Sequence, residues 1–456
     1  MRERSLDWRV LVVGLGTIVV PLDSAVNVAF PAITRAFGLP LEQIQWVVIV
    51  YMLAQTSLML VFGRIGDMVG YRRVFLAGSA VSVLAMAACA AAPTYGWLLA
   101  GRVVQGVGAG LVLSCGPALA TSLRPEAMRA RVLGLYTMLY SAGFALGPAI
   151  AGLLVARFGW PSVFWFRAPV ALAAFAATWA LPASPRRGTG QRFDGLGAGL
   201  LVLGIALAVL ALDRLQHLAA GAGWLVGAGL LALAVFWLFG RQEARAAQPI
   251  IDLRFFGIPG FARVTLAAAL INLACFSVLL LLPFYLSQVV QLGPRDIGLV
   301  LACAAVGMVA ASPAAGMLAG RFGSLTLAVA GCLGMAAGLG GIAAAPRLGW
   351  LLLALLVQGL GQGLFMVAFL DIVTATLPPE ARGVAGSLGM LTRTVGVVIG
   401  ASVLTLAFRS MLGTDGVFLS AFQAVFAFAA AVPAVCSAVL LLPGRRGGAY
   451  TKSLSS

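Results

Sequence analysis

Long apolar runs separated by short polar segments make up most of this chain of 456 residues. Many are long enough to cross about 30 Å of hydrocarbon as a helix, which rises about 1.5 Å per residue. They lie near 10–30, 46–63, 74–92, 97–121, 131–156, 163–182, 195–212, 221–239, 262–286, 297–317, 325–345, 350–376, 384–407 and 418–442. The pattern predicts an all-α polytopic membrane protein with fourteen transmembrane helices.

Polar connectors divide these runs into groups. Arg-rich segments at 183–194 and 240–261 flank the two central runs and leave six runs on either side. The predicted units are an N-terminal six-helix bundle (1–182), a linker with two additional transmembrane helices (183–261), a C-terminal six-helix bundle (262–444) and a cytoplasmic tail (445–456).

An internal repeat supports the division into two bundles. The segment Gln105-Gly106-Val107-Gly108 recurs 253 residues later as Gln358-Gly359-Leu360-Gly361, and Leu123–Ala127 recurs near 377–381. Because an even number of predicted spans lies between the copies, both have the same orientation in the membrane. Parallel halves of this kind place a binding site at their interface near the bilayer midplane, which is typical of transporters.

Composition and charge set the topology. The chain is 61% hydrophobic and 10% charged, with a mean hydropathy of +1.03, too apolar for a soluble core. If both termini lie inside, 21 of the 30 Lys and Arg fall in inner segments and six in outer loops. This bias predicts a multi-pass protein of the cytoplasmic membrane with both termini cytoplasmic. Because the net charge of +16 is spread over short loops, it does not indicate a nucleic-acid partner.

Other classes of partner find little support in the residue pattern. The six cysteines lie in apolar segments without metal-ligand spacing, so we expect neither a metal nor a cofactor. No nucleophile or metalloprotease motif is present, and we do not expect an enzyme. We expect a monomer in the lipid bilayer.

A charged decapeptide from Gly63 to Arg72, followed by Arg73, separates the second and third runs. A central Arg or Asp costs about 2.5 to 3.5 kcal/mol in a membrane helix, so this segment must be a tight loop at the membrane surface. The candidate conformational residues there are Gly63, Asp67, Gly70, Arg72 and Arg73.

Small residues recur in the fifth run. Gly143, Gly147, Pro148 and Gly152 lie on successive turns of the predicted helix. Glycines four residues apart let helix backbones approach closely, and a proline bends its helix.

Ionisable side chains inside the runs are the candidate functional groups. Asp23 and Asn27 are one helical turn apart and share a face. Asp23 and Arg102 differ in membrane depth by roughly 6 Å at 1.5 Å per residue, a gap that an Arg side chain can bridge. Since Arg102 needs a partner in the membrane, we expect it to pair with Asp23.

These motifs resemble the major facilitator superfamily, and within it the fourteen-span drug:proton antiporters, over residues 10–442. The matching segments are the decapeptide, residues 98–110 with Arg102, Gln105, Gly106 and Gly108, the glycines of the fifth run, and Leu22–Pro31. Met68, Tyr71 and Ala151 depart from the usual patterns. The resemblance implies that the decapeptide latches the cytoplasmic side in one conformation and that the fifth-run motif belongs to antiporters.

We therefore expect Asp23 to carry a proton, with burial favouring its neutral form and Arg102 its ionised form. The alternative is a permanently ionised structural pair. Asp371 is a second candidate for proton or substrate binding, and it could pair with Arg393. By analogy with the family, the substrate cavity is lined by Asn27, Gln105, Asn272, Ser277, Gln358, Gln362 and Arg393. Hydrogen bonding between helices is an equally good role for the uncharged ones.

The function expected from the sequence is proton-coupled export of hydrophobic drugs or a natural product by alternating access. Its partners are then a small-molecule substrate and protons. Proton-coupled symport of a small metabolite and a transporter-like sensor are the alternatives. The sequence does not identify the substrate.

Overall fold

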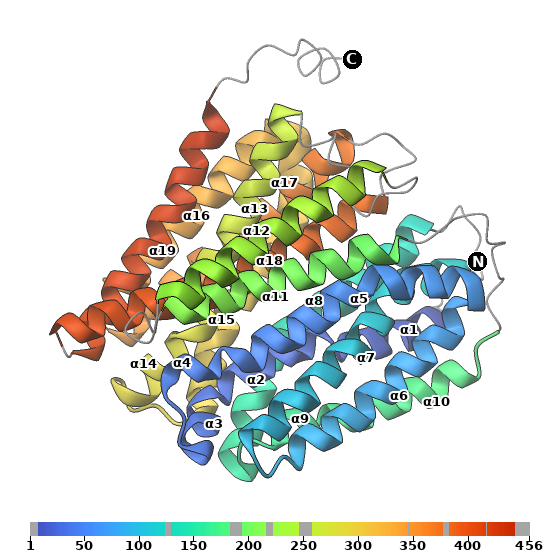
Figure 1. The fold of residues 1–456 in the computed structure, drawn as a ribbon, viewed down its shortest axis with the longest axis horizontal. Helices are drawn as coiled ribbons and strands as arrows, with labels where there is room; N and C mark the ends of the chain where they lie inside the picture. Colours follow the sequence, from blue (N-terminus) through green and yellow to red (C-terminus); the bar gives the residue numbers. More distant parts are fainter. Residues whose placement is uncertain are drawn as a thin grey trace.

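The protein is described from a computed structural model, which covers residues 8–123, 129–182, 194–215, 222–245, 258–344, 347–376, 383–415 and 417–442. All regular secondary structure in these ranges is helical (Figure 1). The first part contains α1 (Trp8–Ile18), the 3-10 helix η1 (Pro21–Ser24), α2 (Ala25–Val28), α3 (Phe30–Phe37), α4 (Leu41–Ile44), α5 (Trp46–Val69), α6 (Tyr71–Ala90), α7 (Tyr95–Ser122), α8 (Arg129–Phe158), α9 (Ser162–Trp165) and α10 (Arg167–Trp179).

The remaining helices follow in the same pattern. They are α11 (Gly195–Leu215), α12 (Ala222–Arg245), α13 (Pro259–Leu280), α14 (Leu282–Gln288), α15 (Pro294–Phe322), α16 (Ser324–Ala343), α17 (Leu348–Thr376), α18 (Gly383–Asp415) and α19 (Phe418–Leu441). Each apolar run in the sequence therefore coincides with a helix or with a broken helix.

Eleven of the described helical segments are long and apolar enough to cross a membrane. Two further segments, Trp46–Met59 and Gly195–Ala208, are apolar but shorter. Large apolar side chains such as Trp97, Leu172 and Leu441 are exposed on the helix surfaces, as expected for groups that face lipid rather than water. The protein is thus a multi-span helical membrane protein.

The internal repeat in the sequence continues in the packing of the helices. Gly106 on α7 meets the backbone of Tyr51 on α5, and Gly359 on α17 meets the backbone of Ala304 on α15. Gly359 and Ala304 each lie 253 residues after their counterparts. Because no side chain larger than hydrogen fits at Gly106 or Gly359, both helix pairs have the same close backbone contact.

The turns that follow α5 and α15 are also equivalent. Gly70 has φ 98° and Gly323 has φ 82°, values that favour glycine over other residues. These two glycines are again 253 residues apart. The decapeptide, expected to form a tight loop, is mostly helical, because Gly63–Val69 form the last turns of α5 and Tyr71 begins α6. Only Gly70 forms the turn between the two helices, and this glycine turn is repeated in the second half of the chain.

Helices α1–α10 contact α13–α19 mainly through α8 with α15, α5 with α18 and α3 with α14. We call the end that carries α3 and α14 the α3–α14 end, and the opposite end, where α5 connects to α6, the α5–α6 end. In Figure 1 the two helix groups come together at the α3–α14 end and diverge toward the α5–α6 end.

Two hydrogen bonds between α5 and α18 show how far this contact extends. Thr405 donates to the Gln45 carboxamide at 3.0 Å near the α3–α14 end, and the hydroxyls of Thr56 and Thr394 lie 2.6 Å apart near mid-helix. The contact between α5 and α18 thus reaches from one end of the molecule to its middle.

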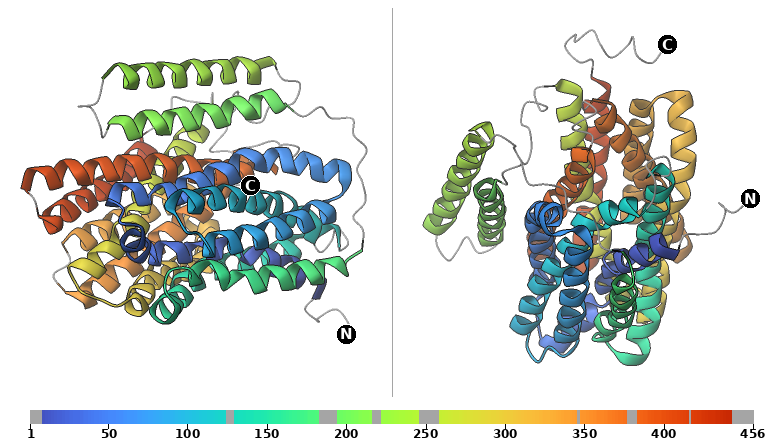
Figure 2. Two further views of the ribbon diagram at one scale, coloured as in Figure 1. Left: turned by 60° about the horizontal axis from the view of Figure 1, so that its bottom comes forward. Right: turned by 90° about the vertical axis from the view of Figure 1, so that its right-hand side faces the viewer.

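Helices α11 and α12 lie outside the two groups. Figure 2 shows α12 on the far side of α11 from the other helices. α11 packs against α12 and also contacts α5 and α18, at the seam between the groups.

Candidate functional site

A break in the first membrane-spanning segment positions Asp23. α1 ends at Ile18, and the chain then forms the short helices η1 and α2. Pro21 begins η1, and because proline lacks an N–H it is well suited to the first turn of a helix. Asp23 lies within this irregular segment, not in the regular helix α1.

Arg102 on α7 holds the Asp23 carboxylate with both ends of its guanidinium group. Nη1 lies 2.7 Å from Oδ1 and Nη2 lies 2.8 Å from Oδ2, and Nε donates to the Val47 carbonyl at 2.8 Å. Two parallel charge-assisted hydrogen bonds are the strongest pairing that Arg and a carboxylate make. The structure thus brings together the pair expected from membrane depth.

A second arginine, which the sequence analysis did not single out, contacts the same carboxylate. Arg167, at the start of α10, donates from Nη1 to Asp23 Oδ1 at 2.7 Å and from Nε to the Val163 carbonyl at 2.9 Å. Gln105 adds a hydrogen bond to Oδ1 at 3.1 Å. An Arg between the apolar residues Phe166 and Ala168 was the available signal, because such a charge needs a partner in the membrane.

The cluster of Asp23, Arg102, Arg167 and Gln105 is buried. Both arginines are 0% exposed and the Asp23 side chain is 12% exposed. The Tyr51 ring centroid lies 4.2 Å from Arg102 Cζ, and Phe164 lies near both guanidinium groups. Arg167 Nη2 has no hydrogen-bond partner among the described residues. With all three groups ionised, the cluster has a net charge of +1.

Protonation of Asp23 therefore has a structural consequence. A neutral carboxyl group would leave two buried guanidinium groups without a counterion, and an uncompensated buried charge costs several kcal/mol. The described arrangement of η1, α7 and α10 therefore suits an ionised Asp23.

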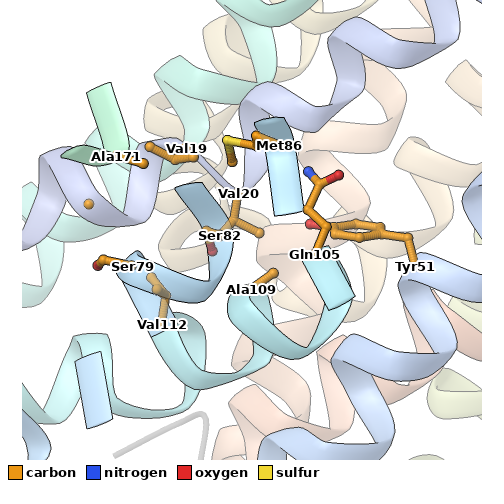
Figure 3. A pocket seen from close by; sticks show the side chains of 11 residues that line it. Val19, Val20, Tyr51, Ser79, Ser82, Met86, Gln105, Ala109, Val112 and Ala171 are labelled. Atoms are coloured by element: carbon orange, nitrogen blue, oxygen red, sulfur yellow. The ribbon is translucent and has the colours of Figure 1, made fainter. Parts of the chain in front are cut away.

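A small cavity of about 10 Å³ adjoins the cluster. Its lining includes Tyr51, Gln105 and the hydroxyl residues Ser79 and Ser82 (Figure 3). In Figure 3, Gln105 and Tyr51 lie next to each other at one wall. The volume is near the minimum that holds one water molecule. The site therefore has room for a water beside Gln105, and for nothing larger.

Among the described residues of the second half, no ionic cluster lies at the equivalent positions. At the repeat distance of 253 residues, Leu355 replaces Arg102, and Gln358 replaces Gln105. Gln358 is buried, and its Nε2 donates to Cys275 Sγ at 3.3 Å and to Gln362 Oε1 at 3.2 Å. Gln358 and Gln362 thus form a neutral hydrogen-bonded pair.

Three of the predicted cavity residues are hydrogen-bonded within their own helical segment. Asn27 donates to the Ser24 carbonyl, Asn272 to Ala268 and Ser277 to Ala274. All three are buried. These bonds fit the packing role rather than direct access to a substrate, although Asn27 Oδ1 has no partner in the described part of the chain.

The structure does not bring Asp371 and Arg393 together, and the expected pairing is wrong. Asp371 is exposed and accepts a hydrogen bond from the Ser324 hydroxyl at the start of α16. Arg393 instead donates to Tyr140 Oη at 3.3 Å, on α8 of the other helix group. The two side chains face different neighbours, which membrane depth alone does not reveal.

The decapeptide residues have separate roles in the described structure. Gly70 provides the turn, and Arg72 donates to the carbonyls of Thr178 and Trp179 at the end of α10. Arg73 is exposed, and no side chain approaches Gly63 within 4 Å. The side chain of Asp67 lies outside the described part of the structure. The described contacts thus tie α6 to α10, within one helix group.

The glycines of α8 contact two different partners. A Cβ at Gly143 would lie 2.7 Å from Ile18 Cγ1, and one at Gly147 would lie 3.2 Å from the Leu22 carbonyl oxygen. Further along α8, beyond Pro148, a Cβ at Gly152 would lie 2.7 Å from the Pro294 carbonyl oxygen on α15. α8 therefore packs against the broken first segment beside Asp23 and against the other helix group.

Two parallel groups of helices with a buried ionic cluster define a membrane transport protein. The sequence model of the Major Facilitator Superfamily matches residues 13–290 and again 264–455. The chain belongs to this superfamily, whose members are transporters and not enzymes.

Relatives cover most of the chain. It is 29% identical to the riboflavin transporter RibZ of Clostridioides difficile over 91% of both chains. It is 30% identical to the tetracenomycin C resistance and export protein of Streptomyces glaucescens, over 90% of this chain and 77% of that protein. It is 29% identical to the methylenomycin A resistance protein of Streptomyces coelicolor, over 89% and 86%.

Solved structures share the fold at low sequence identity. A bacterial homologue of the human lysosomal transporter Spinster, crystallised in an inward-facing and unoccupied conformation, superposes with a TM-score of 0.69 at 15% identity and covers 95% of both chains. The xylose transporter XylE from E. coli gives a TM-score of 0.62 at 15% identity, over 96% of this chain and 98% of that one.

Proposed function

We propose that the protein is a proton-coupled antiporter that exports hydrophobic drugs or a natural product across the cytoplasmic membrane by alternating access. The observation that carries the proposal is the buried Asp23 carboxylate, held by Arg102 and Arg167 at the break in the first span. In this proposal all fourteen helical runs span the membrane, and both termini lie in the cytoplasm.

The ionic cluster supports proton coupling. A proton on Asp23 would leave two buried arginines without a counterion. The protonated and ionised forms of Asp23 would therefore favour different arrangements of η1, α7 and α10. One carboxylate that is protonated in one arrangement and ionised in the other is sufficient to couple a proton to transport. Asp371 lies at an exposed position, bonded to Ser324, and is the less suitable carrier.

Two observations support export, and a third supports the orientation in the membrane. Relatives of about 29 to 30% identity are named as resistance or export proteins. The α8 glycines resemble the antiporter motif and pack against the segment that carries Asp23. The excess of Lys and Arg in the inner segments would put the α5–α6 end in the cytoplasm.

Alternating access requires two units that move against each other. We propose residues 1–182 and 262–444 as these units, joined by the linker 183–261. The described conformation would then be closed at the outer α3–α14 end, where Thr405 bonds to Gln45, and opened toward the cytoplasm.

The test is proton-driven export, measured as accumulation of the substrate inside everted membrane vesicles that contain the wild type, Asp23→Asn or Asp296→Asn. Asp296 is an exposed acid in the first turn of α15 and serves as the matched control. We expect a protonophore to stop efflux by the wild type, Asp23→Asn to reduce it to the background of empty vesicles, and Asp296→Asn to leave it unchanged. The proposed coupling is ruled out if Asp23→Asn keeps full proton-driven activity, or if the protonophore does not change the transport rate of the wild type.

Uptake is a second candidate, because the riboflavin transporter RibZ matches the chain over 91% of its length. A symporter would accumulate riboflavin in intact cells along the proton gradient, whereas an exporter would accumulate its substrate in everted vesicles. The direction of riboflavin flux in the two preparations separates these functions.

A further inference from the structure

Arg393 occupies a central position between the two helix groups. Its Nη1 lies 3.3 Å from the hydroxyl oxygen of Tyr140, and Tyr140 precedes it by the repeat distance of 253 residues. When a residue contacts its own counterpart in the other half, both lie beside the axis that relates the halves. In proteins with parallel repeats, the substrate site lies at this interface near the midplane.

The described groups that contact Arg393 are neutral. Its Cζ lies 5.0 Å from the Phe144 ring centroid, and the neighbouring Thr394 is hydrogen-bonded to Thr56. A guanidinium group has five N–H donors. In the described part of the chain only one of them makes a hydrogen bond to protein, and that bond is long. The side chain is partly exposed, so the other donors are accessible to a ligand.

No described carboxylate balances the charge of Arg393. Asp23 is already bound by Arg102 and Arg167, and Asp371 contacts Ser324 at the end of another helix. Away from the ends of the predicted spans, three arginines face only two acids. An intramembrane charge without an internal partner is expensive and usually serves function.

We propose that Arg393, with Tyr140 and Phe144, binds the anionic group of an aromatic substrate, such as a carboxylate, sulfonate or phenolate. The guanidinium group pairs with the anion, and the two aromatic rings contact the substrate ring. This proposal rests on the proposed transport function and adds the charge of the transported compound.

A matched pair of fluorescent probes tests the proposal. 1-Anilinonaphthalene-8-sulfonate and N-phenyl-1-naphthylamine share one ring system, and only the first carries an anionic group. Binding of each is measured to the purified full-length protein in nanodiscs, with protein-free nanodiscs as background. Export of both probes is measured separately, as their accumulation inside everted vesicles.

The variants are Arg393→Gln, Arg393→Lys and, as the control, Arg409→Gln at an exposed position of the same helix. We expect the wild type to bind the sulfonate more tightly than the neutral probe. Arg393→Gln should weaken sulfonate binding about tenfold or more, the effect of a charge-assisted hydrogen bond, and leave the neutral probe unchanged. Arg393→Lys should retain part of the preference, and Arg409→Gln all of it.

Wild-type protein that does not prefer the sulfonate, or an Arg393→Gln variant that keeps the preference, overturns the proposal. An equal loss of binding for both probes in Arg393→Gln also overturns it, because that result indicates misfolding or a role in packing. If Arg393 sets the preference in binding but neither probe is exported in vesicles, the anion site stands and the proposed export function fails.

Discussion

Arg102 and Arg167 hold the same carboxylate in different ways. Arg102 makes two hydrogen bonds to Asp23 and further bonds to Val47 and Gln105. Arg167 makes one bond to Asp23 and one to the carbonyl of Val163, four residues earlier in the chain. Arg102 is therefore the principal partner, and Arg167 adds a second charge.

This difference predicts unequal effects of the two neutral substitutions. Arg102→Gln should cost about 3 to 5 kcal/mol, because it breaks a buried ion pair. Arg167→Gln should cost about 1.5 to 3 kcal/mol, the contribution of a hydrogen bond to a charged group. The measurement is the thermal unfolding midpoint of each purified variant in the same detergent.

An equal loss of stability in the two variants would contradict the unequal roles. Gln105→Leu is a useful control, since it removes two hydrogen bonds to the charged groups of the cluster but no charge. We expect it to be the mildest of the three substitutions.

The sequence predicted the pairing of Asp23 with Arg102 because membrane depth can be counted along a helix. It did not predict Arg167, because Arg102 alone is sufficient to balance the charge of Asp23 and the sequence does not show where the start of α10 packs. The pairing of Asp371 with Arg393 was wrong for a related reason. Depth does not say which neighbouring helix a side chain faces, and that direction depends on the packing of the whole bundle.

The glycines of α8 pack both against the segment that carries Asp23 and against the other helix group. The hydropathy pattern predicted the position of this helix and of the others, since apolar length is a strong signal. It did not predict the breaks at η1 or between α13 and α14, which lie inside continuous apolar runs. Such breaks depend on local prolines and on tertiary contacts that satisfy the backbone.

Two glycine-to-alanine substitutions should have opposite effects. In Gly152→Ala the new Cβ would lie 2.7 Å from the Pro294 carbonyl oxygen and 2.9 Å from that of Arg295. Since these backbone atoms cannot move aside alone, we expect a cost of about 1 to 3 kcal/mol and reduced transport. In Gly63→Ala nothing lies within 4 Å, and we expect unchanged transport and a gain of about 0.5 to 1 kcal/mol.

Thermal unfolding midpoints and efflux rates of the two variants check this prediction. Wild-type behaviour of Gly152→Ala would show that the close contact of α8 with α15 is unimportant. Loss of transport in Gly63→Ala would show that Gly63 makes a close contact in a conformation other than the described one.

The arrangement of two repeated helix groups was predicted from the sequence, because the repeat of 253 residues is visible in short motifs. The position of α11 and α12 was not. Only the structure shows α11 against α5 and α18, with α12 packed on α11 (Figure 2). The two helices lie beside the seam between the groups and not within either of them.

Removal of residues 194–245, which contain both helices, should therefore leave a folded transporter. Loss of an even number of spans keeps the orientation of the second group, and the contacts of α8 with α15 are untouched. We expect a lower thermal midpoint, because α5 and α18 lose their neighbour, with efflux retained. Removal of α11 alone is the control and should abolish efflux, since it inverts the second group.

The absence of an ionic cluster around Leu355 and Gln358 makes the two halves unequal despite their shared architecture. The first half contains the buried ionic cluster, whereas the second half contributes Arg393 to the interface between the two helix groups. A hybrid protein made of two first halves would contain two copies of the cluster of Asp23, Arg102 and Arg167. A hybrid made of two second halves would contain no copy of this cluster. Under the proposed function, energy input would then be confined to one of two halves that share an architecture.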